Sequence, residues 1–158
     1  MINKKVVIKK LLDAPIEKVF DAWIDPLYMQ QWYSPENMTT PHAEIDLRIG
    51  GSYSVTMRYK DPSSSDGMTV RGVYKEIQKP TKLRFSWQWD GQEDITEVTV
   101  LLRAISERET ELTLIHAGFK DKFYEKGFTK ADHSGGWTSA FNKLEAFLKE
   151  TNLEGGDK

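Results

Sequence analysis

The three histidines are the residues of this chain best suited to acid–base chemistry. By the periodicity of their surroundings, His116 and His133 fall on inward faces, and His42 is the third. In an apolar pocket, an imidazole serves as a polar anchor or a general base, because burial tunes it near neutrality. The alternative is a core or rim histidine that is hydrogen-bonded to backbone, and no reaction partner stands beside either residue to argue against it. We therefore assign no catalytic residue, and the sequence favours a binding protein over an enzyme.

Other chemistry has little support in the sequence. The histidines occur neither at an i, i+4 spacing nor in an H-E-x-x-H pattern, so we predict no metal site. The chain has no cysteine, which excludes disulfides, thiolate metal sites and a cysteine nucleophile. Gly50-Gly51 lacks the lysine-serine or G-x-G-x-x-G pattern of a phosphate-binding loop and predicts a turn instead. No cofactor is predicted.

Aromatic side chains point to a pocket for a planar or apolar ligand. The segment "KLRFSWQWD" (82–90) alternates, with Phe85, Trp87 and Trp89 on one face. A packed core is the other interpretation of the same rings, and for Trp87 and Trp137 the sequence leaves both open. The predicted ligand-binding residues share inward registers: Tyr53, Met57, Phe85, Trp87, His116, His133, Trp137 and Phe141.

A long amphipathic helix is predicted over residues 132–150. Its inward face is formed by residues that recur at the spacing of one helical face, namely Trp137, Phe141, Leu144 and Leu148. Gly135 and Gly136 open this helix, although each weakens it by about 1 kcal/mol relative to alanine. A chain tolerates that cost where a backbone must come close or where a ligand must fit. The opposite face is predicted to meet water and carries Ser139, Asn142, Lys143, Glu145 and Lys149.

The elements that position these residues indicate an α+β fold. A first strand over 4–12 is followed by two short helices before Pro35, and alternating segments joined by short turns come next. Such a series predicts an antiparallel meander, and the whole sheet is expected to hold about six to seven strands. We expect a curved antiparallel sheet that grips the C-terminal helix, in a single domain over 1–152 with a polar tail at 153–158.

Composition limits the classes of partner. The 158 residues are 39% hydrophobic and 29% charged, with a formal charge of −2. Because a nucleic-acid-binding protein normally shows a clustered basic face, we expect no nucleic-acid partner. The N-terminal segment is interrupted by lysines and does not resemble a signal peptide, and no later segment resembles a membrane span. A cytoplasmic location is expected.

Five segments occur in the order expected of one family: 14–35, 46–57, 72–87, 96–119 and 133–148. Together they resemble the bacterial proteins similar to the C-terminal domain of the heat-shock protein 90 ATPase activator. That family lies in the helix-grip superfamily (START-like, SRPBCC), with START lipid-transfer domains, birch-pollen-type allergens and polyketide cyclases. The resemblance implies a helix-grip fold with a cavity between sheet and long helix that takes small hydrophobic molecules.

Two alternatives to a ligand-binding protein stay open. One is a cyclase- or hydrolase-like enzyme that uses the same cavity, with His116 or His133 moving protons. The other is a protein-interaction domain, with a chaperone partner by analogy with the activator, or a homodimer. The segment 119–128 distinguishes the interaction alternative from ligand binding: its aromatic residues form either an exposed apolar patch for a partner or a lid over the cavity. These residues are Phe119, Phe123, Tyr124 and Phe128.

Overall fold

The computed structural model describes residues 5–61, 63, 67–118 and 130–155, together with the side chains of 136–150 in the last helix. Three helices are assigned within these residues: α1 (Ile16–Ile24), α2 (Pro26–Trp32) and α4 (Lys130–Gly155). The strands are β1 (Val6–Leu12), β2 (Met38–Ile45), β3 (Ser52–Tyr59), β4 (Gly67–Gln78), β5 (Lys82–Trp89), β6 (Thr96–Ser106) and β7 (Glu109–Ala117).

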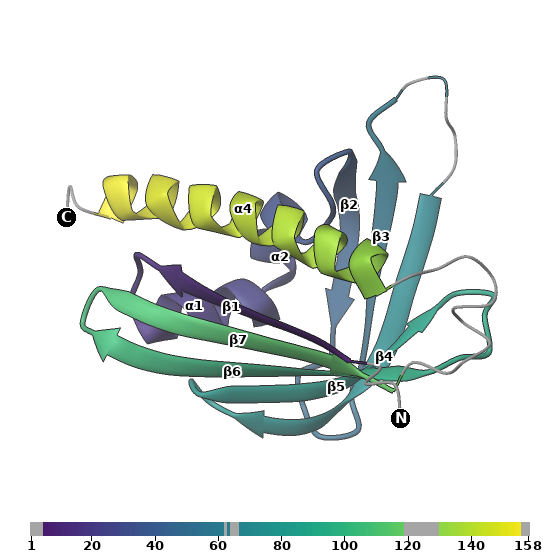
Figure 1. Cartoon of the computed structure of the whole chain (residues 1–158), viewed down its shortest axis with the longest axis horizontal. Helices are drawn as coiled ribbons and strands as arrows, with labels where there is room; N and C mark the ends of the chain where they lie inside the picture. The colour runs from purple at the N-terminus through teal and green to yellow at the C-terminus, as the bar shows by residue number, and fades with distance from the viewer. Residues whose placement is uncertain (1–4, 62, 64–66, 119–129, 156–158) are drawn as a thin grey trace.

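The strands form one antiparallel sheet in the order β1-β7-β6-β5-β4-β3-β2. The meander from β2 to β7 is therefore confirmed, and β1 joins it beside the last strand. The sheet is strongly curved, and α4 crosses its concave side (Figure 1). This arrangement confirms the α+β helix-grip fold.

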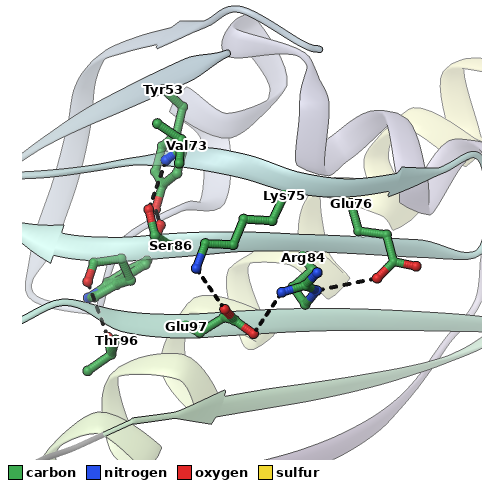
Figure 2. Close-up of polar contacts among 9 residues, drawn as sticks. Tyr53, Val73, Lys75, Glu76, Arg84, Ser86, Thr96 and Glu97 are labelled. Atoms are coloured by element: carbon green, nitrogen blue, oxygen red, sulfur yellow. Dashed lines mark hydrogen bonds and ion pairs between the residues drawn. The ribbon is translucent and has the colours of Figure 1, made fainter. Parts of the chain in front are cut away.

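Strands β4 and β5 approach each other very closely at Gly72. A Cβ atom on Gly72 would lie 2.0 Å from the carbonyl oxygen of Ser86, so the close approach of the strands requires glycine. Ser86 of β5 is hydrogen-bonded to residues of β4 and β3. Its hydroxyl accepts from the Val73 N–H at 2.9 Å, and its carbonyl accepts from the Tyr53 hydroxyl at 2.5 Å (Figure 2). A register shift follows in β4, between Tyr74 and Glu76.

The last helix is longer than the sequence predicted. It begins at Lys130 and ends at Gly155, so Gly135 and Gly136 lie inside it and it continues into the predicted tail. It contacts β1, α1 and α2. The predicted inward face is confirmed, because its four residues are buried: Trp137, Phe141, Leu144 and Leu148.

One strand, β2, was not predicted. Its sequence, "MTTPHAEI", contains Pro41, and proline is rare in strands because it cannot donate to the ladder. The structure accommodates Pro41 in an edge strand, with a register shift in the pairing to β3 between Thr39 and His42. Neither the proline nor the register shift produces the alternation of apolar and polar residues from which a strand is predicted.

Candidate functional site

A cleft of about 540 Å³ lies between the first described side chains of α4 and residues of β3, β4 and β5. Its third boundary is the segment 33–38, which connects α2 to β2. Its volume is in the range of sites for small organic ligands. The residues that line it are Tyr33, Ser34, Pro35, Asn37, Met38, Met57, Tyr59, Gly67, Met68, Thr69, Trp87, Trp89, Asp90, Gln92, Gly136, Trp137 and Ala140.

Three mutually contacting rings, which we call the aromatic wall, line this cleft: Tyr33, Trp87 and Trp137. The ring centroids of Trp87 and Trp137 are 5.1 Å apart, and Tyr33 lies 5.7 Å from Trp137 and 6.2 Å from Trp87. All three side chains are buried. Aromatic rings at such distances stabilise one another beyond the area that they bury. The wall is therefore a pre-formed apolar surface.

A chain of hydrogen bonds fixes the aromatic wall to the sheet through His116. The Trp137 Nε1–H donates to His116 Nδ1 at 3.1 Å, and the His116 Nε2 lies 2.7 Å from the Thr96 hydroxyl. The Thr96 hydroxyl in turn donates to the Trp87 carbonyl at 3.3 Å.

These contacts determine the form of the imidazole. Because an indole nitrogen can only donate, His116 Nδ1 must accept, and the ring proton is on Nε2. A doubly protonated ring would turn one N–H toward another, so the arrangement requires neutral His116. With an exposed fraction of 0%, His116 holds the two tryptophans in place, which is the structural rather than the catalytic interpretation.

The segment 33–38 is held in place by Lys143 of α4. The Lys143 ammonium donates to the carbonyls of Pro35 and Met38, both at 2.7 Å, and to the Ser34 hydroxyl at 2.8 Å. Burial lowers the pKa of Lys143, and the charge of Lys60 lowers it further. Three oxygen atoms thus take the three N–H donors of this ammonium.

The prediction that this side of α4 simply meets water was wrong at two positions. Lys143 is half-buried in the contact just described, and Ser139 accepts a hydrogen bond from the Glu36 backbone N–H at 3.1 Å. Both residues lie one helical turn apart and face the same segment. Helical periodicity does not report tertiary contacts, so the sequence did not indicate that these two residues bind the segment 33–38.

One buried polar atom of the aromatic wall has no hydrogen-bond partner among the described residues. This atom is the buried Trp87 Nε1. Leaving a buried donor unsatisfied costs about 1–3 kcal/mol. The Trp23 Nε1 is in the same state, but Trp23 does not line the cleft.

Tyr33, Tyr53 and Tyr74 form a set that we call the tyrosine cluster. Burial raises the pKa of the Tyr33 hydroxyl well above its usual range, and the nearby Tyr53 and Tyr74 add to the effect. Burial likewise raises the pKa of Tyr53, with a further contribution from Tyr74, and the pKa of Tyr74 itself. All three are neutral phenols at neutral pH, so the Tyr33 hydroxyl is available as a donor.

The structure divides the predicted ligand-binding residues into two groups. Met57, Trp87 and Trp137 line the cleft. The second group is buried away from it, in the core: Tyr53, Phe85, His116 and Phe141. The side chain of His133 and the segment 119–128 lie outside the described residues. Tyr33, Met38 and Met68 line the cleft but were not predicted.

On the other side of β4–β6, opposite the buried face, charged side chains are paired (Figure 2). Arg84 contacts Glu76 and Glu97, both at 3.3 Å, and Lys75 contacts Glu97 at 3.1 Å. A hydrogen bond from Lys82 lowers the pKa of Glu76, despite some opposing desolvation. Exposed pairs of this kind contribute little to stability, and this face therefore offers a solvated surface rather than a site.

Within the described residues, no group of three His, Cys, Asp or Glu side chains is arranged to hold a metal ion. In the same part of the chain, no helix combines the length and the apolar character that crossing a membrane requires.

Comparison with known proteins identifies the family of this fold. The model of the family described as "Activator of Hsp90 ATPase homolog 1-like protein" matches residues 13–149. No curated protein matches the chain.

Solved structures of several bacterial proteins are similar along nearly the whole chain. An AHSA1-like protein from Aeromonas hydrophila is 25% identical, with a TM-score of 0.75 and coverage of 94% of each chain. A protein from Chromobacterium violaceum is 22% identical, with a TM-score of 0.79 and coverage of 92% of this chain and 97% of that one. An AHSA1 protein from Silicibacter pomeroyi is 22% identical, with a TM-score of 0.75 and coverage of 95% and 99%.

Proposed function

The chain belongs to the Activator of Hsp90 ATPase homolog 1-like family, and we propose that it binds a small, largely apolar or aromatic ligand in the cleft beneath α4. The observation that carries this proposal is the aromatic wall, a rigid apolar surface along a cleft of about 540 Å³. Met57, Trp87 and Trp137 are the proposed contacts from the sequence, with Tyr33 added by the structure. Tyr53, Phe85, His116 and Phe141 would support them from behind.

Gly136 gives independent support to the ligand. It lies inside α4, where glycine costs about 1 kcal/mol relative to alanine. A Cβ atom at Gly136 would meet only the Cγ of Pro35, at 3.8 Å, which is an ordinary contact. Close approach of the described backbone therefore does not require this glycine. Gly136 lines the cleft, so the space that it leaves open is space for a ligand.

A panel of apolar and aromatic compounds, followed by tryptophan fluorescence and native mass spectrometry, tests the proposal. Trp87 and Trp137 line the cleft, so an occupant changes their emission. The blocking variant is Ala140→Phe, which adds a ring at the buried, cleft-lining Ala140. Its matched control is Ala146→Phe, the same change on the exposed side of the same helix.

We expect at least one compound to bind the unmodified protein and the Ala146→Phe variant with equal affinity, and the Ala140→Phe variant at least tenfold more weakly. Circular dichroism confirms that both variants are folded. If no compound binds the unmodified protein, or if Ala140→Phe binds as tightly as the control, the cleft is not a ligand site. Stimulation of the ATPase activity of the large heat-shock chaperone, without ligand binding, would favour the interaction alternative.

A further inference from the structure

The charge of the cleft restricts the ligand. Of the described residues that line the cleft, Asp90 alone carries a charge. Its carboxylate is paired with the Arg71 guanidinium at 2.5 Å. The lining therefore holds no lysine or arginine that would compensate a buried carboxylate or phosphate, and an uncompensated buried anion is strongly disfavoured.

Lys143, which contacts residues that line the cleft, already uses its hydrogen-bond donors. The Lys143 ammonium donates hydrogen bonds to Ser34, Pro35 and Met38, which all line the cleft. An ammonium has three N–H donors, and these three oxygen atoms take them all. Binding of an anion by Lys143 would require it to release the segment 33–38.

The buried polar atom that the cleft lining leaves without a partner is a donor. Trp87 is only 6% exposed, and its Nε1–H has no acceptor among the described residues. An indole nitrogen donates and cannot accept. The Tyr33 hydroxyl of the same wall is a second donor, because burial raises its pKa and keeps it protonated. A ligand with an acceptor would give the Trp87 Nε1–H a hydrogen bond. The cost of removing this N–H from water is already part of the unliganded fold, so the new bond is favourable.

We propose that the cleft selects an uncharged, planar ligand that presents a carbonyl-type acceptor to Trp87, with Tyr33 as a second donor, and that it discriminates against carboxylates and phosphates. This inference rests on the proposed function, because it specifies the ligand of the same site. The flat rings of the aromatic wall favour a planar ligand, the absence of an available cation in the described lining excludes an anion, and Trp87 orients the acceptor.

A matched series on one ring system tests the inference: acetylnaphthalene, ethylnaphthalene and naphthoate, substituted at the same position. Titration calorimetry measures their dissociation constants for the unmodified protein and for three variants. Trp87→Phe removes the indole N–H and keeps an apolar ring, and Tyr33→Phe removes only a hydroxyl. Trp23→Phe makes the same change as the first variant on a buried indole whose N–H also lacks a partner but which does not line the cleft, and is the control.

For the unmodified protein, we expect the ketone to bind about 2- to 10-fold more tightly than its ethyl analogue, the size of one hydrogen bond between neutral groups. Naphthoate should bind at least about 100-fold more weakly than the ketone, because its charge is buried without a partner. The preference for the ketone should disappear in Trp87→Phe, decrease in Tyr33→Phe and persist in Trp23→Phe, while the ethyl compound binds Tyr33→Phe unchanged.

The outcomes separate this inference from the proposed function. Equal binding of naphthoate and the ketone, or of the ketone and the ethyl compound, overturns the selectivity inference and leaves ligand binding standing. Loss of the ketone preference in Trp23→Phe but not in Trp87→Phe overturns the assignment of Trp87. If none of the three compounds binds the unmodified protein, both proposals fail for planar ligands. The comparison of the three ligands on the unmodified protein tests the selectivity even if a variant does not fold.

Discussion

Replacing Thr96 with valine tests the hydrogen-bond chain behind the aromatic wall. Valine has nearly the shape of threonine, so the change removes one buried hydroxyl and little else. The His116 Nε2–H loses the acceptor that it has at 2.7 Å, and the Trp87 carbonyl loses a donor at 3.3 Å. Loss of a buried donor's partner costs about 1–3 kcal/mol, so we expect the free energy of unfolding to fall by about 2 kcal/mol. For a domain of this size, that lowers Tm by about 4–8 °C.

Urea denaturation followed by tryptophan fluorescence measures the loss. The matched control is Thr99→Val, in the same strand but on its other side, where the hydroxyl has no hydrogen bond within the described part of the chain. We expect the control to change stability by less than about 0.5 kcal/mol, as surface substitutions usually do. Equal effects of the two substitutions would refute the assigned tautomer and the structural role of His116. Near-ultraviolet circular dichroism should report altered tryptophan packing in Thr96→Val alone.

Three further perturbations follow from the same contacts. Gly136→Ala should raise the free energy of unfolding by about 1 kcal/mol, because the added methyl group meets only an ordinary contact; a loss of stability in urea denaturation would contradict this. Lys143→Met should lower the free energy of unfolding by about 2 kcal/mol, because three oxygen atoms lose their donor. Lys149→Met, on the exposed side of α4, is its control in thermal denaturation and should have little effect. At alkaline pH, the tyrosine cluster should lower stability: its pKa values are raised in the folded state, so its contribution is complete below about pH 10 and is lost as pH rises further. Tyrosinate absorbance and unfolding curves at several pH values check this, and stability that stays constant above pH 10 would contradict it.

The inward faces of the elements could be predicted from the sequence because burial follows the period of each element directly. The alternation of β5 placed Phe85 and Trp87 on the buried face, and the helical period of α4 did the same for Trp137 and Phe141. The same patterns could not distinguish a residue that lines the cleft from one that fills the core. Trp87 and Phe85 occupy equivalent positions two residues apart, yet only Trp87 lines the cleft.

The rest of the site depends on irregular backbone and tertiary contact. Tyr33 follows α2 with φ −82° and ψ 60°, a conformation outside both helix and strand, so no periodicity marks it as inward. Lys143 was assigned to water because a lysine on a polar helix face usually lies there. The acceptors that hold it come from a segment more than a hundred residues earlier in the chain, at Ser34 and Pro35.

The pairing of β1 with β7 has a consequence for the newly made chain. β1 leaves the ribosome first among the strands, but its hydrogen-bonding partner in the sheet is the last strand to be synthesised. Translation adds roughly 5–20 residues per second, so β1 waits roughly 5–20 s before β7 emerges. During that time, the edge of β1 that will pair with β7 has no partner strand, and the apolar side chains of Val7 and Leu11, which stay exposed in the folded protein, lie along it. Lys9 and Lys10 lie between these two apolar residues, and charges of this kind oppose edge-to-edge association until the sheet can close.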